Sequence, residues 1–516
     1  MSLGLQTAQL RRLVQVLIRV DASRLIGAGH VVRCLALAAG LRECGAQVAF
    51  ICRSAEGDLA DFIAAEGHGL HLLPKPESPW SWQEDCTATL EVVRNKPRAD
   101  WLVVDHYDLD KQWETALQPF VPRLLVIDDL ANRPHAANLL VDPGIGAVGS
   151  LYRSLVPATC RLMLGPRFAL LRPEFAERAR AEAARVDDEG GILACVGGAD
   201  PKDVLSTILE AWQLLPAPKP ALQLVVGSSS PNVAKLRRAV AGLAGVTLHV
   251  QTARMAELMA GSRFLVCAAG SISWERCCLG RAAIMGALAD NQRENLKTLT
   301  KLRTGLSIGD WIGVSVATLA ALIEKLVRHP GLARRMGARA RRLVDGRGAD
   351  RVSSHMAASS GYLHLRAATP ADAAPAWQWR NDDETRRHFT NPGAVELDRH
   401  LEWWSAVLAD HRRDLLIAVL GARPVGVLRL DHNADEAVVS VYVDPALTGV
   451  GLGPYILRAA QQWTNRHRPD MAAMVADILP QNSASVSAFL AAGFSPEGTR
   501  WKWRAQIRAD ARGVQC

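Results

Sequence analysis

The stretch RVDASRLIGAGHVVRCLALA, residues 19–38, decides the fold of the first part of the chain. Its apolar start belongs to a strand-like run, VQVLIRV, and leads into a turn that contains Gly27 and Gly29. The apolar spacing after this turn predicts a helix, and His30 lies in its first turn. Glycine lets backbone amides approach a substrate oxygen, and the positive end of a helix favours a neutral imidazole. The segment therefore predicts a binding turn that carries a base, although a simple turn with a capping histidine would use the same residues.

The regions around this stretch predict two parallel sheets. The runs VQVLIRV, VAFICR, WLVVDHY and LLVIDD alternate with helical stretches, which indicates a first Rossmann-like domain over residues 14–178. The pattern restarts with GILACVGGAD, ALQLVVGSSS, VTLHVQ, FLVCAAG and AAIMGAL, so a second such domain is expected over residues 187–345. Ligands of open α/β sheets bind beyond the carboxyl ends of the strands, and two facing domains predict a cleft there.

The last part of the chain has a different pattern. An arginine-, alanine- and serine-rich stretch predicts a closing helix and a polar linker, with the linker over residues 346–362. Helices are then expected around residues 377–387 and 397–410, with strands at LLIAVL, RPVGVLRL, AVVSVYVD and MAAMVADIL. These elements predict an α+β domain over residues 363–505, so the expected fold is two α/β domains followed by an α+β domain.

Composition narrows the classes of function. A chain of 516 residues with 49% hydrophobic residues has room for about three domains. The net charge of +8 is mostly scattered, so no nucleic-acid partner is expected, and no apolar run predicts a membrane span or a signal peptide. The protein is therefore expected to be cytoplasmic. Ten cysteines without metal-ligand spacing indicate reduced, structural thiols and no metal.

The second domain supplies candidate ligand-binding residues at three strand ends. CVGGAD places two glycines directly after a strand, AAGSISWERCCLG opens a helix whose N-terminus suits a diphosphate, and LADNQREN adds a polar loop. A glutamate in the first turn of that helix is positioned to hold ribose hydroxyls. The candidates are Gly197, Gly198, Gly270, Ser271, Glu275, Asn291 and Gln292. Capping and turn formation explain any one of them about as well.

Taken together, these motifs resemble the UDP-sugar hydrolases of pseudaminic acid biosynthesis. The resemblance rests on RVDASRLIGAGHVVRCLALA, LVVDHYDLD, LLVIDDLANRPH, LGPRFALLRPEF, CVGGADPKD, SISWERCCLG and ALADNQ, and covers residues 14–345. It implies a GT-B fold and metal-free hydrolysis of UDP-2,4-diacetamido-2,4,6-trideoxy-β-L-altropyranose to the free sugar and UDP, in a pathway of flagellin glycosylation. It also implies that His30 activates water and that Asn291 is the asparagine of the family's N-Q loop.

Several points in this region stay open. Asp21 is a second catalytic candidate that either orients His30, binds a sugar hydroxyl or caps a helix, whereas Asp105 and neighbouring strand-end residues have no distinguishable role. LLVDPG stands at residues 139–144 where family members often have LLLDQN, which puts the role of those two polar residues in doubt. The main competing class is a GT-B glycosyltransferase of the muramyl-lipid type, but the first domain lacks the expected apolar, membrane-facing helix.

The third domain contains a second glycine-rich loop. VYVDPALTGVGLGPYIL, residues 441–457, has a strand, a loop whose amides can surround a pyrophosphate, and a helix. With PQNSASVSAFLAAGF at residues 480–494, it resembles the GNAT acetyltransferase superfamily, which implies an acetyl-CoA site. The expected acetyl-CoA-binding residues are Val443, Gly449, Gly451, Gly453 and Asn482.

WRNDDETRRHFTN and HLEWWSAVL further resemble GNAT enzymes that acetylate the 4-amino group of a UDP-sugar in the same pathway. Two departures are Thr448, at the start of the loop, and Phe489, where a tyrosine often acts as general acid. Glu402 and His400 are candidate bases, and four tryptophans could stack on a nucleotide or pack in helices. The sequence thus predicts a bifunctional enzyme for a UDP-amino sugar, with UDP as a product and other enzymes of the pathway as partners. The alternative is a hydrolase with a non-catalytic acetyl-CoA-binding module.

Overall fold

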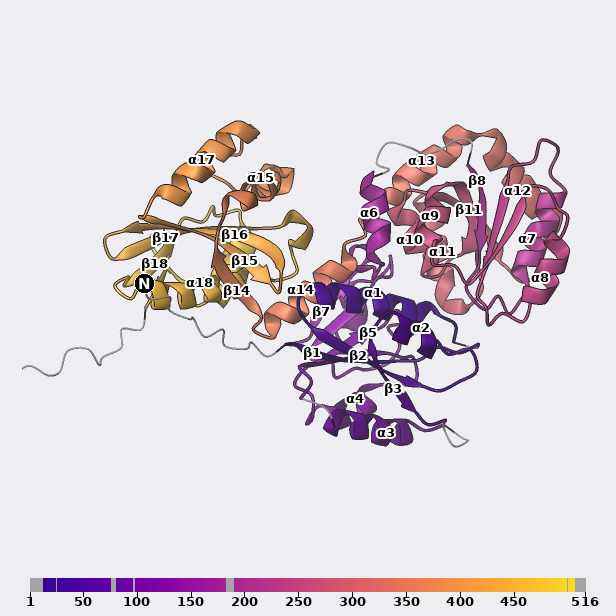
Figure 1. The fold of residues 1–516 in the computed structure, drawn as a ribbon, viewed down its shortest axis with the longest axis horizontal. Coiled ribbons are helices and arrows are strands. Elements are labelled where there is room, and N and C mark those ends of the chain that lie inside the picture. Colours follow the sequence, from indigo (N-terminus) through magenta and orange to yellow (C-terminus); the bar gives the residue numbers. More distant parts are fainter. Residues whose placement is uncertain are drawn as a thin grey trace, which may run out of the picture. The chain divides into compact units, whose positions relative to one another are not determined.

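A computed structural model describes residues 13–24, 26–75, 80–95, 98–181, 190–498 and 500–505. These residues form two compact units (Figure 1). One contains residues 15–40 and 47–352, and the other contains residues 41–46 and the chain from residue 353 onward.

The first sheet of the larger unit is parallel, with the order β3-β2-β1-β4-β5-β6-β7. Its strands are β1 (Gln15–Val20), β2 (Gln47–Arg53), β3 (Gly69–Leu73), β4 (Trp101–Asp105), β5 (Leu124–Ile127), β6 (Leu139–Asp142) and β7 (Arg161–Leu164). Its helices are α1 (Gly29–Glu43), α2 (Ala60–Ala65), α3 (Trp82–Arg94), α4 (Lys111–Leu117) and α5 (Gly149–Tyr152). Figure 1 shows α3 and α4 on one face and α1 on the other, so both faces are covered, and most residues of the central strands are apolar and buried.

The second sheet is also parallel, with the order β10-β9-β8-β11-β12-β13. Its strands are β8 (Gly191–Cys195), β9 (Leu222–Val226), β10 (Val246–Val250), β11 (Ser262–Ala268), β12 (Ala282–Ala287) and β13 (Leu306–Asp310). Its helices are α6 (Pro173–Ala181), α7 (Val204–Gln213), α8 (Val233–Val240), α9 (Met255–Ala260), α10 (Ile272–Cys278), α11 (Arg293–Lys301), α12 (Val316–Arg328) and α13 (Pro330–Arg341). Two apolar clusters, one on each face, form the core.

The third sheet has the order β14-β15-β16-β17-β18-β20-β19 and is antiparallel except between β17 and β18. Its strands are β14 (Leu363–Ala367), β15 (Arg413–Leu420), β16 (Arg423–Asn433), β17 (Glu436–Val443), β18 (Ala473–Ala476), β19 (Ser495–Glu497) and β20 (Arg500–Arg504). Its helices are α15 (Ala373–Asn381), α16 (Asp383–Arg386), α17 (Leu397–Ala409), α18 (Gly453–His467) and α19 (Ser483–Ala491). Two parallel α/β sheets followed by a mixed α+β sheet confirm the predicted fold class.

Two details differ from the sequence-based expectation. Most of the segment expected to be a linker is helix α14 (Gly348–Ser359), whose residues from Arg351 to Ala358 are buried. The helix expected over residues 377–387 is interrupted at Asp382, which has extended backbone and accepts hydrogen bonds from the amides of Glu384 and Thr385. A side chain that caps a new helix start ends the preceding helix there. Among the described residues, no helix is long and apolar enough to cross a membrane.

Candidate functional site

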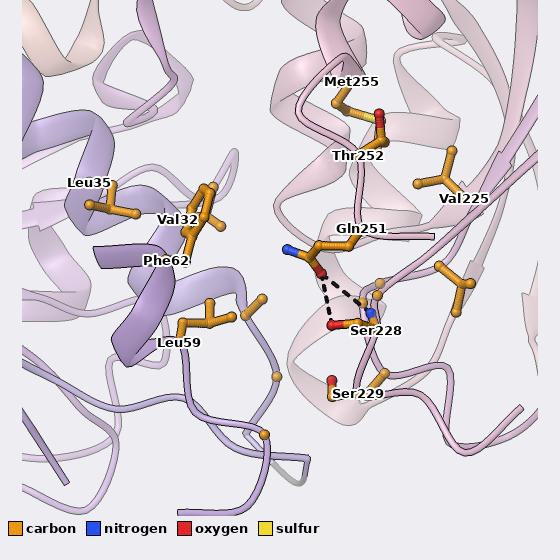
Figure 2. Close-up of a pocket in the computed structure, with 18 of the residues that line it drawn as sticks. Val32, Leu35, Leu59, Phe62, Val225, Ser228, Ser229, Gln251, Thr252 and Met255 are labelled. Carbon is orange, nitrogen blue, oxygen red and sulfur yellow. Dashed lines mark hydrogen bonds between the residues drawn. The ribbon is translucent and has the colours of Figure 1, made fainter. Parts of the chain in front are cut away.

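A cavity of about 530 Å³ lies between the two parallel-sheet halves of the larger unit. Figure 2 shows its two walls: Val32, Leu35, Leu59 and Phe62, from α1 and the region of α2, face a wall that contains Ser228 and Gln251. On this second wall, Gln251 accepts hydrogen bonds from the amide and hydroxyl of Ser228 at 3.3 and 3.5 Å. The cleft between two Rossmann-like halves is the GT-B arrangement, and its location agrees with the rule that ligands bind beyond the carboxyl ends of the strands.

Four of the predicted site residues line this cavity. Gly27 comes from the turn before α1, Gly197 and Gly198 follow β8, and Glu275 lies on α10. Gly27 and Gly197 have φ of 81° and 113°, which glycine adopts without strain. The carbonyl of Gly198 accepts a hydrogen bond from the amide of Gly227 at 2.8 Å, and a side chain at Gly227 would meet that carbonyl oxygen at 2.7 Å, so the segments after β8 and β9 approach closely there. These glycines keep the cavity wall made of backbone.

His30 is the second residue of α1 and is 9% exposed. Its Nδ1 lies 2.6 Å from Oδ1 of Asp105, the last residue of β4. Strand register explains the contact, because Val20 at the end of β1 pairs with Asp105 and the chain then turns into α1. A carboxylate can only accept, so Nδ1 donates to Asp105; Nη2 of Arg33 lies 3.1 Å from Nδ1 but has no acceptor to offer. Nε2 is then the ring nitrogen that can accept a proton. This is the tautomer that a general base needs.

Arg33 binds the same Asp105 carboxylate beside His30. Its Nε and Nη2 each donate to Asp105 at 2.6 Å, and its Nη1 donates to Asp129 at 3.0 Å. Burial by itself would raise the pKa of Asp105, but the charge and hydrogen bonds of Arg33, together with His30, outweigh it and hold that pKa well below its ordinary value. Asp105 is therefore a fixed anion beside the histidine.

Tyr107 connects this cluster to the second half of the unit. Its ring packs edge-on against His30 with centroids 4.7 Å apart, and its hydroxyl donates to Asp129 at 2.7 Å. Asn291, from the loop after β12, donates through Nδ2 to the Tyr107 hydroxyl at 3.4 Å. The structure thus brings Asn291 next to the His30 cluster.

The other predicted residues of this region lie around the start of α1 or in the loop of Asn291. A side chain placed at Gly29 would meet Oγ of Ser271 at 3.6 Å, so the N-termini of α1 and α10 approach each other across the cleft. A side chain at Gly270 would meet Nε2 of Gln292 at 3.3 Å. Gln292 itself accepts a hydrogen bond from the amide of Leu288 at 3.0 Å, which fixes the loop. None of these four residues lines the cavity of Figure 2.

Asp21 does not orient His30, which corrects that part of the expectation. Its carboxylate pairs with the buried Arg19 at 2.5 Å, lies 3.2 Å from Nε2 of His106 and accepts the amide of Arg53 at 2.7 Å. Burial would raise the pKa of Asp21, but Arg19 and His106 hold it well below its ordinary value. Arg19 also binds Asp85 at 2.6 Å, so Asp21 belongs to a buried ion network beneath the strand ends. The sequence showed only that Asp21 and Asp105 both end strands, so it could not tell which one meets His30.

Glu275 is half-buried in the cavity wall and its pKa is raised to about 7. The main cause is burial, and Glu174 adds a further increase, whereas Arg172 acts in the opposite direction.

The segment LLVDPG at residues 139–144, which departs from the pattern of the resembled family, forms a defined hydrogen-bonded turn. Asp142 accepts hydrogen bonds from the amide of Gly144 and from the hydroxyl of Tyr152, at 2.7 and 2.9 Å, in a buried cluster with Asp128.

The smaller unit has a splayed strand pair beside a glycine loop. β17 pairs with β18 only from Glu436 to Val438, so its later backbone edge, up to Val443, is not paired with β18. The loop between this strand and α18 contains Gly449 and Gly451, with φ of 77° and 82°. Alternating backbone conformations of this kind turn amides toward a shared concavity, which suits an anion.

The remaining predicted acetyl-CoA residues also have structural roles. Asn482 caps α19 by accepting the amide of Ser485 at 3.0 Å. A side chain at Gly453 would come within 2.8 Å of Ala488, so glycine there permits α18 and α19 to pack. Phe489 is 4% exposed and packs edge-on against Phe494 at 4.9 Å, which places its ring in the core.

The two candidate bases of this domain differ in exposure. His400 is buried between Trp403 and Trp404, and this burial lowers its pKa, whereas Glu402 is exposed. Trp404 is a core residue whose Nε1 donates to the carbonyl of Thr369 at 3.0 Å, which favours packing over nucleotide stacking. Among the residues that the structure describes, no cluster of His, Cys, Asp and Glu could hold a metal ion.

Two Rossmann-like halves around a cleft, followed by a mixed sheet with a splayed strand pair, define a GT-B-type pair joined to an acetyltransferase-type domain. Residues 362–495 match the family model of the acetyltransferase (GNAT) domain. The chain is 29% identical over 261 residues to the UDP-2,4-diacetamido-2,4,6-trideoxy-beta-L-altropyranose hydrolase of Campylobacter jejuni, covering 50% of this chain and 86% of that protein. The chain is therefore a fusion of a hydrolase-like region with a GNAT domain.

Two further similarities cover about two thirds of the chain. The spore coat polysaccharide biosynthesis protein SpsG of Bacillus subtilis is 25% identical over 331 residues, which cover 64% of this chain and 93% of that protein. Among solved structures, MurG of Acinetobacter baumannii matches with 16% identity and a TM-score of 0.48, over 66% of this chain and 99% of that chain.

Proposed function

We propose that this chain is a bifunctional enzyme that acts twice on a UDP-amino sugar. The GNAT domain acetylates the 4-amino group with acetyl-CoA, and the cleft hydrolyses the resulting UDP-2,4-diacetamido-2,4,6-trideoxy-β-L-altropyranose to the free sugar and UDP. The observation that carries the second step is the 2.6 Å contact between His30 and Asp105 at the edge of a cleft. The similarity to a hydrolase of that name supports the choice of substrate.

In the hydrolytic step, His30 acts as general base. Its Nε2 takes a proton from water, the water oxygen bonds to the anomeric carbon, and the bond from this carbon to the diphosphate oxygen breaks. Asp105 stabilises the imidazolium that forms, because Nδ1 already donates to its fixed carboxylate. The electron pair of the broken bond leaves with UDP, whose charge the amides at Gly270 and Ser271 stabilise.

The two walls of the cleft divide recognition between them. Gly197, Gly198 and Glu275 hold the uridine end of UDP within the cavity, with Glu275 accepting from ribose hydroxyls, and the diphosphate extends beyond it to the start of α10. Asn291 and Tyr107 lie beside His30 and contact the sugar. This division predicts that changes in the two sets affect affinity for UDP and turnover differently.

In the acetyl-transfer step, the loop amides of Gly449 and Gly451 bind the coenzyme A diphosphate. The free edge of β17 binds the pantetheine arm, and the neutral sugar amine attacks the thioester carbonyl. The thiolate leaves without a proton from Phe489, since a phenyl ring cannot donate one. The buried position of Phe489 is also the observation that favours a second candidate, an acetyl-CoA-binding module without turnover.

The test is to incubate the chain with the UDP-linked 4-amino-4,6-dideoxy-N-acetyl-altrosamine, with and without acetyl-CoA, and to follow sugar mass and UDP by mass spectrometry. UDP release that requires acetyl-CoA and yields a doubly acetylated free sugar supports both activities and their order. Hydrolysis of supplied diacetamido substrate without any acetylation supports the binding-module candidate. Transfer of the sugar to an acceptor instead of water would indicate a glycosyltransferase.

A substitution in the coenzyme loop separates the two activities. Gly451→Val places a β-branched side chain at φ of 82°, which strains the loop and fills the space near the diphosphate. We expect acetyl transfer to fall at least 100-fold while hydrolysis of supplied diacetamido substrate is unchanged. Gly498→Val, at a glycine with φ of 61° outside the loop, is the matched control and should leave acetyl transfer near the wild-type rate.

A further inference from the structure

Helix α14 precedes the matched GNAT residues, yet one of its side chains reaches the coenzyme loop. His355 is 8% exposed, and its Nδ1 lies 2.9 Å from the carbonyl oxygen of Val450, between Gly449 and Gly451. Its ring also packs edge-on against Tyr455, two residues into α18, with centroids 6.3 Å apart. The GNAT match begins at residue 362, so this contact comes from outside the recognised domain.

The hydrogen bond fixes the direction of a neighbouring amide. A carbonyl oxygen can only accept, so Nδ1 of His355 carries the hydrogen. In a trans peptide, the C=O of one residue and the N–H of the next point in opposite directions. Holding the Val450 carbonyl toward His355 therefore turns the Gly451 amide away from α14. Among the described residues, that amide has no hydrogen-bond partner within the chain.

The orientation of the peptide between Val450 and Gly451 must be fixed by a contact because glycine does not fix it. The peptide between Val450 and Gly451 can flip easily because Gly451 accommodates both signs of φ. One orientation presents the amide to an anion, and the other presents a carbonyl oxygen, which repels it. Val450 is fully buried, so its carbonyl would lose a partner at appreciable cost if His355 were absent. His355 thus selects the orientation that an anion requires.

We propose that His355 is a positioning residue for acetyl-CoA, which holds the Gly451 amide toward the coenzyme diphosphate. It acts through the backbone and touches no substrate. The proposal rests on the proposed use of acetyl-CoA by this domain. It follows that the acetyltransferase function needs residues of α14 in addition to the matched domain.

Two substitutions of opposite character test the proposal in the full chain. His355→Asn keeps an N–H donor near the position of Nδ1 but loses most of the ring packing on Tyr455. His355→Leu keeps a buried apolar volume but removes the donor. Measured by calorimetric titration with CoA, we expect Kd to rise about tenfold for His355→Leu and less than about threefold for His355→Asn. Pantetheine, which lacks the diphosphate, should bind the wild type and both variants equally.

The alternative is that His355 only packs. In that case His355→Asn binds CoA more weakly than His355→Leu does, and the variants lose affinity for CoA and pantetheine together. Either result overturns the proposal. Unchanged CoA affinity in both variants also overturns it. Thermal unfolding without ligand checks that each variant folds, and UDP affinity should match wild type in both. A wild type that binds CoA but acetylates no amine overturns the proposed activity alone. A wild type that binds no CoA overturns both.

Discussion

The two parallel sheets have similar architecture but opposite chemistry at their carboxyl ends. In the first sheet, β1 and β4 lead into the carboxylates of Asp21 and Asp105, each paired with a buried or nearly buried arginine. In the second sheet, the corresponding ends lead into glycines such as Gly197 and Gly270. One half thus presents charges and a histidine, and the other presents backbone amides.

The two kinds of strand end have different structural requirements. A buried carboxylate is tolerated only when it is paired, so Asp21 and Asp105 are each accompanied by an arginine. Backbone amides carry no net charge, so the second half needs only glycines that let a ligand approach. We infer that the first half performs chemistry and the second half holds the leaving group. Substitutions in the two halves should therefore have different effects.

The largest expected effect is at the base itself. His30→Ala removes the proton acceptor, and we expect UDP release from the diacetamido substrate to fall about 10³-fold, measured by mass spectrometry. The variant should still bind UDP, because His30 lies outside the cavity wall. His249→Ala, on β10 of the second half, is the matched control and should retain nearly full rate. Equal losses in both variants would contradict the division of roles.

The second prediction contrasts the two strand-end acids. Asp105→Asn removes the anion that orients His30, so kcat should fall about 10²-fold or more. Asp21→Asn instead leaves Arg19 partly unpaired within the buried network and should lower the free energy of unfolding by about 3 kcal/mol. Denaturant unfolding and kcat of the folded protein distinguish them. If Asp21→Asn alone lowered kcat, Asp21 would contact the reaction after all.

A smaller effect is expected where the two halves meet. Asn291→Ala removes the Nδ2 donor that contacts Tyr107 and should lower kcat/KM for the UDP-sugar about tenfold. UDP alone should bind with nearly unchanged affinity, since Asn291 faces the His30 side of the cleft. Asn295→Ala, one turn further along the chain, is the control. A loss of UDP affinity at Asn291 would place it with the nucleotide instead.

The smallest effect concerns Glu275 and pH. Its folded pKa of about 7 is above its ordinary value of 4.5, so the folded state binds more protons than the unfolded state between these values. The free energy of unfolding therefore decreases as pH rises through this window. Glu275→Gln cannot titrate, so its decrease between pH 5 and 8 should be smaller by about 1 kcal/mol, which is less than the full pKa shift implies because solvent screens this half-buried side chain. Thermal unfolding of both proteins at both pH values measures the difference. If the free energy of unfolding changed equally with pH in the wild type and the variant, the pKa of Glu275 would not be raised.

Sequence patterns predicted the fold well because each element carries its own local signal. Apolar runs gave the parallel strands, and a glycine loop before an amphipathic helix gave the third domain. The pairing of His30 with Asp105 was beyond the sequence, since it depends on the register of β1 with β4. The three-residue spacing of His30 and Arg33 on one helix face was the available signal for the missing arginine. The capping role of Asp382 was also a local signal, but the same sequence is compatible with a helix that continues through this residue.

The burial of Phe489 has a consequence for how acetyl transfer would depend on pH. A tyrosine acid loses its proton near pH 10, and an enzyme that relies on one slows as pH rises toward that value. The phenyl ring of Phe489, which lies in the core, has no ionisable proton. The thiol of coenzyme A can leave as its anion and take its proton from water later. The transfer rate should therefore climb as the amine becomes neutral and then level off, with no alkaline decline due to this position.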